Sequence, residues 1–331
     1  MSTLANVALS IGAAALFVGC GGSQPPIGAP GAVGYYSNSH EVWRSKGNGS
    51  TAGDLLYAFF GNGVTNLVYV LTYPGGSVVN SGSLPNDLFG SCVDGSGNVF
   101  VASQGKSDNA IYEFPPGGVT PSETLSDSGR AWDCSVDATT GNLAVANFYD
   151  TAAPGGPAPD IAVYGPGQQT PVLYGSTFFE DIQSCAYDDK GNLFIYGLGA
   201  GGAPILAELA SGSSVITLLG LNVSIGGFAS LRWDGEHIAI TVVQKRTPTK
   251  IYQIALYGST AEVVGTTTLK SHSYKKEVKW PYGWMTGGDV VESTLGGIGL
   301  WRYPSGGKQQ KTFKKAGSGF YSVTISVAPS R

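Results

Sequence analysis

Charged and aromatic side chains gather in short segments that each precede a run of strand-forming residues. Carboxylate oxygens are the ligands that Ca²⁺ prefers, and aromatic rings stack on sugars or pack against peptides. We therefore interpret these side chains as a rim that binds a protein or carbohydrate ligand, with Ca²⁺ as the one cofactor it could hold. The alternative is that the charged side chains only face solvent and the aromatic rings only pack within the fold. The members are Asp87, Arg130, Trp132, Asp133, Glu180 and Asp181, together with Glu277 in a later segment.

Other chemical signatures are absent from the sequence. The histidines His40, His237 and His272 share no local ligand spacing, so we predict no zinc site. No Gly-x-Ser-x-Gly elbow, phosphate-binding loop or dinucleotide fingerprint occurs. We accordingly assign no catalytic residue.

The segments that carry the rim belong to an internal repeat. A turn built from an aromatic or leucine residue followed by Pro, Gly or Ser recurs along the chain, and Pro and Gly supply the φ angles that tight turns need. Its copies begin at Tyr73, Phe114, Tyr164, Leu209, Leu256 and Tyr303. Successive copies start 41 to 50 residues apart, which is the interval of a propeller blade with four short strands.

A second turn lies out of phase with the first. It reads Asp, a short spacer, then Gly-Asn before an apolar run, and it begins at Asp94, Asp137 and Asp188, with a looser copy at Asp234. Gly-Asn between apolar β runs is a hairpin signal because both residues tolerate positive φ. Each repeat therefore has two hairpin turns and four strands.

The two ends of the repeat region complement each other. The chain enters at what reads as a second strand, Leu55–Phe60, and leaves on a first strand, Tyr321–Val327. Pairing of these ends would complete a blade and protect the edges of an open array. We predict an all-β fold over residues 51–331: a six-bladed β-propeller of four-stranded blades, closed by the C-terminal strand pairing with the N-terminal blade.

This pattern resembles that of the NHL-repeat and gluconolactonase-like six-bladed propellers. The chain as a whole also resembles uncharacterised bacterial exported lipoproteins, in which a lipoprotein signal precedes such a propeller. Gluconolactonase-type enzymes hold a divalent metal with a Glu, an Asn and an Asp, but no residue here aligns with that Glu. Streptogramin lyase-type propellers rely on histidine, and no matching pair is present. The resemblance thus implies the fold, and the leading hypothesis is a non-catalytic binding or scaffold protein. The alternative is a metal-dependent lactonase- or lyase-like hydrolase that uses the acidic rim.

The N-terminus predicts export. Leu4–Gly19 is an apolar run of signal-peptide length, and Cys20 follows a glycine as in a lipobox. We predict a lipoprotein-type signal peptide (1–20), lipidation of Cys20, a flexible Gly/Pro/Ser-rich tether (21–50) and a monomer anchored to the bacterial cell envelope. Phe17 and the lack of Lys or Arg before the run depart from the pattern, which leaves an uncleaved anchor or an ordinary signal peptide as alternatives.

The remaining cysteines, Cys92, Cys134 and Cys185, fall in first strands of successive repeats. A disulfide or a metal cluster is one interpretation. We favour the other, in which they are small apolar residues in a crowded centre, because equivalent positions on adjacent strands should lie too far apart for a disulfide.

Charge is distributed unevenly. Residues 245–315 carry 12 Lys or Arg and four Asp or Glu, whereas the whole chain has a net charge of −4. This separation of basic and acidic segments could orient the protein against an anionic polymer or a lipid headgroup surface. The alternative is that the charges only keep the protein soluble. Nucleic acid is not an expected partner of an exported protein.

Overall fold

The computed structural model describes residues 53–61, 65–105, 108–148, 158–223, 225–226, 228–243, 247–270, 282–286, 288–294, 297–313 and 320–327. All of them belong to one compact unit of the chain, Tyr36–Arg331. The predicted signal peptide with Cys20 and the predicted tether lie outside the described residues, as do His40, His272 and Glu277. In the described part, no helix is long and apolar enough to cross a membrane.

The described residues form strands, with one short 3-10 helix, η1 (Ala200–Gly202). The strands assemble into five sheets, four of which have four strands each. In hydrogen-bonded order these four sheets are β25 (Phe320–Ser326), β1 (Leu55–Gly61), β2 (Asn66–Thr72) and β3 (Val78–Leu84); β4 (Asp87–Val93), β5 (Val99–Gln104), β6 (Asn109–Phe114) and β7 (Glu123–Asp127); β8 (Arg130–Val136), β9 (Leu143–Phe148), β10 (Asp160–Tyr164) and β11 (Val172–Gly175); and β20 (Trp284–Met285), β21 (Asp289–Thr294), β22 (Gly297–Arg302) and β24 (Lys311–Phe313).

The fifth sheet has nine strands and contains two further antiparallel runs of four. The runs are β12 (Asp181–Tyr187), β13 (Leu193–Gly199), β14 (Ala203–Leu209) and β15 (Ile216–Leu221), and β16 (Phe228–Trp233), β17 (Ile238–Val243), β18 (Thr249–Tyr257) and β19 (Thr260–Lys270). Their outer strands β15 and β19 join through a short parallel pairing, Gly220 with Thr260 and Leu221 with Ala261. The other end of β19 pairs with β23 (Gly307–Lys308), which lies between β22 and β24 in the chain. The strand β19 therefore contacts segments from both neighbouring sheets at the outer edge of the ring.

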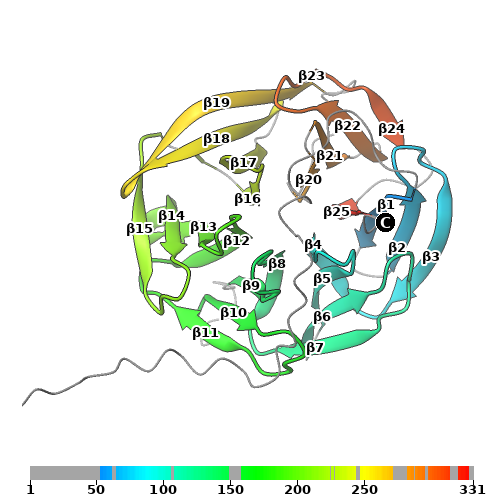
Figure 1. The fold of residues 1–331 in the computed structure, drawn as a ribbon, viewed down its shortest axis with the longest axis horizontal. Helices are drawn as coiled ribbons and strands as arrows, with labels where there is room; N and C mark the ends of the chain where they lie inside the picture. The colour runs from blue at the N-terminus through cyan, green and yellow to red at the C-terminus, as the bar shows by residue number, and fades with distance from the viewer. Residues whose placement is uncertain are drawn as a thin grey trace, which may run out of the picture. The chain divides into compact units, whose positions relative to one another are not determined.

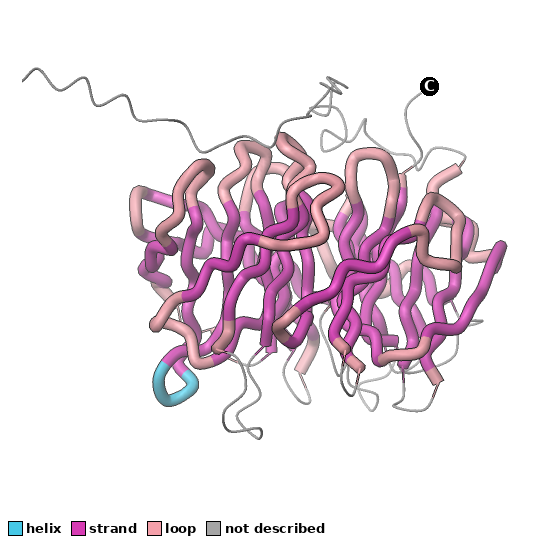
Figure 2. The backbone as a smooth tube through the Cα atoms, turned by 90° about the horizontal axis from the view of Figure 1, so that it is seen from below, coloured by secondary structure: helices cyan, strands magenta, loops and turns pink. Residues whose placement is uncertain are grey.

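The sheets are arranged in a ring, with β4, β8, β12, β16, β20 and β25 around its centre (Figure 1). The C-terminal strand β25 pairs with β1 from Leu55–Ser326 to Phe60–Phe320. This confirms the predicted pairing of the chain's ends. Seen from the side, the strands run between two faces on which the turns lie, with η1 on one of them (Figure 2).

The apolar core lies between adjacent sheets. Tyr57 and Phe59 of β1 meet Phe114 of β6, with ring centroids 6.1 to 6.4 Å apart. Because a sheet packed between two others is buried on both faces, its inner strands read as continuous apolar runs, such as β9 with its first five residues buried.

The Gly-Asn hairpin turns form as the sequence predicts. In the first copy the Asp94 carboxylate accepts hydrogen bonds from the backbone N–H groups of Ser96 and Asn98, at 2.9 and 2.8 Å. Gly97 adopts a φ of 86°, which side-chain-bearing residues rarely take. The Asp188 turn repeats this pattern with Lys190 and Asn192.

The interpretation of the cysteines was wrong for two of the three. Cys92 of β4 and Cys134 of β8 form a disulfide across 5.6 Å between Cα atoms, and Cys185 is buried and free. The expectation of too large a distance assumed equivalent positions on the two strands, whereas Cys92 is one position out of step with Cys134 and Cys185 in the aligned repeats. Closure of a loop of this length stabilises a fold by about 4 kcal/mol in the chain-entropy account.

Candidate functional site

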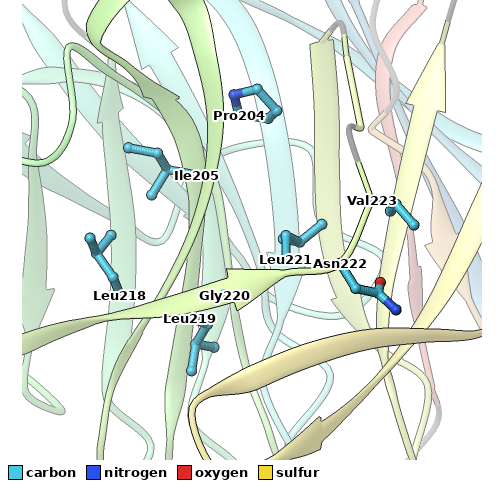
Figure 3. Close-up of a pocket in the computed structure, with 8 residues that line it drawn as sticks. All are labelled: Pro204, Ile205, Leu218, Leu219, Gly220, Leu221, Asn222 and Val223. Carbon is cyan, nitrogen blue, oxygen red and sulfur yellow. The ribbon is translucent and has the colours of Figure 1, made fainter.

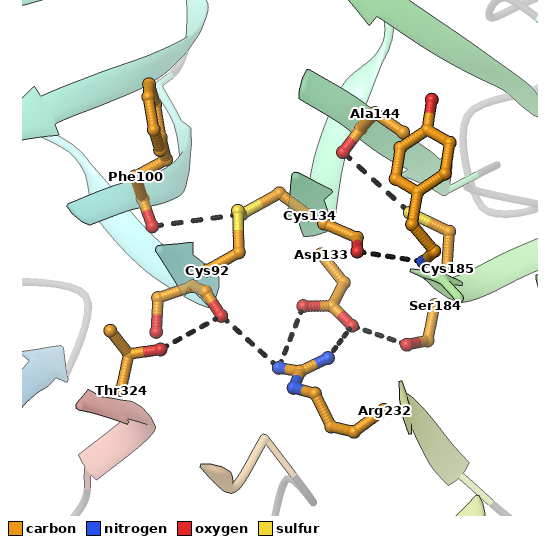
Figure 4. Close-up of a disulfide and its surroundings, with 12 residues drawn as sticks. Cys92, Phe100, Asp133, Cys134, Ala144, Ser184, Cys185, Arg232 and Thr324 are labelled. Atoms are coloured by element: carbon orange, nitrogen blue, oxygen red, sulfur yellow. Dashed lines mark hydrogen bonds and ion pairs between the residues drawn. A yellow bond between two sulfur atoms is a disulfide. The ribbon is translucent and has the colours of Figure 1, made fainter. Parts of the chain in front are cut away.

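The centre of the ring is occupied by a buried arginine, Arg232 of β16 (Figure 4). Its guanidinium makes a salt bridge with Asp133 of β8, with Nη1 to Oδ2 at 2.9 Å and Nη2 to Oδ1 at 3.3 Å. The remaining N–H groups donate to the carbonyl oxygens of Leu231, Ser91 and Gly283, at 2.6, 3.3 and 3.1 Å. All the donors of the guanidinium are therefore satisfied.

The same network reaches the other innermost strands. The Ser184 hydroxyl of β12 donates to Asp133 and accepts the backbone N–H of Leu231. The Thr324 hydroxyl of β25 donates to the Ser91 carbonyl of β4 at 3.4 Å. Burial is the largest single influence on the pKa of Arg232 and lowers it, but Asp133, together with smaller effects of Cys185 and Glu292, acts the other way and the pKa of the guanidinium is raised. The axis thus holds a charged pair whose role is to connect strands.

Glu292 of β21 is the one further acid beside this arginine among the described residues. Its side chain is 2% exposed, and neither carboxylate oxygen has a hydrogen-bond partner in the described part of the chain. Gly283 lies directly across, and a Cβ there would collide with the Glu292 carboxyl. Burial raises the pKa of Glu292 to about 8, against a smaller opposing effect of Arg232.

Three of the predicted rim residues begin strands at one end of the ring, which we call the mouth. Asp87, Arg130 and Asp181 are the first residues of β4, β8 and β12. These strands begin at the same end because four antiparallel strands return the chain to the side from which it started. These three residues therefore share one end of the ring, and their ligand-binding role stays a prediction.

Asp133 does not belong to the mouth. It is fully buried and bound by Arg232 and Ser184, so it is not free to take a metal or a ligand. Glu180 is exposed beside Asp181. Among the described residues, no group of three or more Asp, Glu, His or Cys side chains is arranged to hold a metal ion.

Aromatic rings form a row along the mouth. Trp132 stacks between Phe89 of β4 and Phe148 of β9, with centroid distances of 4.6 and 4.5 Å. Tyr321 of β25 continues the row at 5.6 Å from Phe89, and the Arg130 guanidinium lies 6.0 Å from the Phe148 ring. Trp132 is buried within this row, so it supports the mouth through its neighbours.

Asp181 is the mouth residue whose hydrogen bonding is incomplete. Its Oδ2 accepts from the Gln183 side chain at 3.0 Å, whereas its Oδ1 is buried without a partner among the described residues. Burial raises the pKa of Asp181 to about 6. The Tyr282 hydroxyl donates to the Gln183 carbonyl at 3.3 Å nearby, which ties the site to the segment before β20.

A separate surface pocket lies on the outer side of β14 and β15, with a volume of about 510 Å³ (Figure 3). The side chains that line it are apolar except for the amide of Asn222; the lining residues are Pro204, Ile205, Leu218, Leu219, Gly220, Leu221, Asn222 and Val223. It contains none of the predicted site residues and no side chain that could do acid–base chemistry.

The basic segment is only partly described. Of its 12 basic residues, Lys250, Lys270, Arg302, Lys308 and Lys311 lie in the described part of the chain. Two of these are engaged within the fold: Arg302 pairs with Asp289 at 3.0 Å, and Lys311 donates to the carbonyls of Pro74 and Gly75. The predicted orientation at an anionic surface is therefore still untested.

Arg232 and Glu292 were not among the residues predicted from the sequence. Arg232 stands between Leu231 and Trp233, and Glu292 directly follows Val290 and Val291. A charge next to apolar residues of a buried strand requires a buried partner. That signal was available, but it does not reveal which distant residue is the partner.

No family model matches the chain, and no curated protein matches it in sequence. Solved structures do resemble it. A chain in the crystal structure of a nidogen/laminin complex superposes with a TM-score of 0.59 at 12% identity, covering 84% of this chain and 100% of the other. TolB from Acinetobacter baumannii gives 0.54 at 12% identity, covering 84% and 67%, and a protein from Bacteroides caccae gives 0.57 at 12% identity, covering 83% and 99%. The chain has a β-propeller fold.

Proposed function

We propose that the protein is an exported six-bladed propeller that binds a ligand at the mouth without catalysing a reaction on it. The six blades are the four-stranded sheets together with the two antiparallel runs of the nine-stranded sheet. The observation that carries the binding role is the buried Oδ1 of Asp181, which has no hydrogen-bond partner among the described residues. A buried acceptor without a donor is costly, and a bound donor would remove that cost.

The chemistry of the mouth favours a ligand that is rich in hydroxyl or N–H donors. Asp181 offers an acceptor, Arg130 and Asp87 offer charge, and the ring edges of the aromatic row provide apolar contact. An oligosaccharide or a peptide has this combination of groups. Below the mouth, the N–H groups of Arg232 all donate to oxygens of the protein itself, which supports a ligand site confined to the mouth.

The alternative, a metal-dependent lactonase- or lyase-like hydrolase, has less support. It needs several carboxylates at the mouth, and Asp133 is already held by Arg232. Binding without catalysis is therefore the stronger proposal.

Export and anchoring are part of the proposal. The Cys92–Cys134 disulfide supports folding in an oxidising compartment, because structural disulfides are rare in reducing cytosol. Lipidation of Cys20 would then hold the domain at the cell envelope through the tether.

The test compares wild type with Asp181→Asn, using Asp189→Asn, an exposed acid in the Asp188 hairpin turn, as the control. All three are screened against oligosaccharide and peptide arrays, and hits are quantified by calorimetry. Asp181→Asn replaces an acceptor oxygen with a donor and should weaken binding at least tenfold, whereas Asp189→Asn should have little effect. Equal affinity of Asp181→Asn and wild type for every hit would place the binding site elsewhere.

A further inference from the structure

The carboxyl of Asp181 is a buried charge for which the described residues supply no positive partner. The residue is 9% exposed, and in the described part of the chain it forms no salt bridge. Burial raises its pKa to about 6, and the opposing effect comes from the Gln183 hydrogen bond and not from a cation. Above about pH 7 the group is therefore mostly ionised, in a place where an unpaired charge is costly.

Gln183 fixes this carboxyl but serves only one of its two oxygens. The Gln183 side-chain nitrogen donates to Asp181 Oδ2 at 3.0 Å, and the side-chain oxygen accepts the backbone N–H of Ala229 at 3.2 Å. Rotation of the amide would break both hydrogen bonds, so Gln183 cannot turn to serve the other oxygen. Asp181 Oδ1 has no hydrogen-bond partner among the described residues. A donor that carries a positive charge would both bond this oxygen and compensate the carboxylate.

An exposed aromatic residue begins the strand next to that of Asp181. Phe228 is the first residue of β16, as Asp181 is of β12, and Gln183 joins the two strands through Ala229. Phe228 is 40% exposed. Because alternate residues of a strand share a face, Phe228 lies on the same face of β16 as Arg232, at the mouth end of the axis. A carboxylate and an aromatic ring at one opening are the two groups that recognise an organic ammonium.

A metal ion and a sugar each fit this site less well. A metal ion requires several oxygen ligands, whereas the Gln183 amide presents its nitrogen to Asp181. A sugar stacks on the open face of an aromatic ring, but Trp132 has Phe89 stacked on one face and Phe148 on the other. A peptide amine needs only a carboxylate oxygen and apolar contact for the carbon chain that carries it.

We propose that the mouth binds a peptide through a primary ammonium group, either its N-terminus or a lysine side chain. The ammonium enters from the mouth and donates to Asp181 Oδ1, and Phe228 contacts the carbon chain attached to it. This inference rests on the ligand-binding role proposed above, and it narrows the ligand from a general donor to a cation.

The experiment compares peptides that differ only in the charge of their amines. The full chain is screened against short peptides immobilised through their C-termini, each with a free or an acetylated N-terminus and with lysine or Nε-acetyl-lysine. Hits are quantified by calorimetry for wild type, Asp181→Asn and the exposed control Asp189→Asn. Acetylation removes the charge and two of the three N–H donors, while the rest of the peptide stays the same.

Acetylation of the bound amine should weaken binding to wild type and to Asp189→Asn at least about tenfold. Asp181→Asn should bind both forms with similarly low affinity, because loss of the ammonium and loss of the carboxylate remove the same contact. Melting curves check that each protein is folded. The comparison of the two peptide forms on wild type decides the matter by itself if Asp181→Asn does not fold.

Three results would overturn this inference and leave a binding role for the protein intact. The first is peptide binding to wild type that acetylation does not change. The second is an acetylation effect that persists in Asp181→Asn, which would place the amine elsewhere. The third is binding of oligosaccharides, with or without amino groups, but of no peptide. A protein that binds nothing in either array would contradict the proposed function as well.

Discussion

At the scale of single residues, the interior of this propeller is defined by one arginine and two acids. Arg232 pairs with Asp133, and Glu292 is left beside them without a hydrogen-bond partner among the described residues. A buried ion pair contributes little net stability, but loss of one partner costs about 3 to 5 kcal/mol because the other charge stays buried. Glu292 avoids that cost by keeping its proton.

Glu292 therefore makes stability depend on pH in a definite direction. Its pKa is about 8 in the fold and near 4.5 in the unfolded chain, so the folded state binds the extra proton between these values. The contribution is fully present below about pH 4.5 and is lost as the pH rises through 8, at no more than about 1.4 kcal/mol per pH unit. Glu292→Gln, which stays neutral, should remove this part of the dependence.

The measurement is urea unfolding of wild type and Glu292→Gln from pH 5 to pH 9. The free energy of unfolding of the variant relative to wild type should rise with pH, because only wild type loses the Glu292 contribution. Other acids with a raised pKa, such as Glu113 and Asp181, titrate in both proteins, so their effects cancel in this difference. A constant difference across this range would show that Glu292 is not the group that titrates.

At the scale of elements, closure of the ring depends on β25. This strand pairs with β1 along almost its whole length and adds Val323 and Ile325 to the core shared with β21 and β22. It also supplies Thr324 to the network at the axis. The last strand of the chain is thus the first strand of the first sheet.

Deletion of Phe320–Val327 should expose the edge of β1 and remove the cooperative unfolding of the ring. The matched control ends at Val327, so that it loses only the residues after β25. Melting curves and size-exclusion chromatography are compared for both. We expect the control to resemble wild type and the deletion to melt broadly at lower temperature and to self-associate. A monomeric deletion variant with an unchanged melting temperature would contradict the role of β25.

At the scale of the whole molecule, the proposal is a ligand-binding ring held at the envelope by its N-terminus. Anchoring through Cys20 rests on the sequence pattern at the N-terminus and stays part of this proposal. A single acyl chain binds a membrane only marginally, and durable anchoring takes two or more.

Cys20→Ser should release the protein from membranes without altering the propeller. Wild type and variant are fractionated, and their N-terminal peptides are examined by mass spectrometry. We expect acylated wild type in the membrane fraction and unmodified variant in the soluble fraction, with equal melting temperatures. Wild type that carries an unmodified Cys20 and does not associate with membranes would rule out the anchor.

The parts of this protein that the sequence predicts are those set by local interactions. The Asp94 and Asp188 hairpins are fixed by hydrogen bonds that span no more than four residues, so their motifs reveal them directly. The repeat of such turns then implies sheets, a ring and the pairing of the chain's ends, and it places Asp87, Arg130 and Asp181 at one end.

What only the tertiary structure decides are contacts between residues far apart in the chain. Arg232 and Asp133 are 99 residues apart, and Cys92 and Cys134 are 42 apart. Repeat spacing predicts that their strands are neighbours, but not which side chains meet, because a shift of one residue turns a side chain to the other face of its strand. For that reason Asp133 looked like a ligand at the mouth from the sequence, and in the fold it is the buried partner of an arginine.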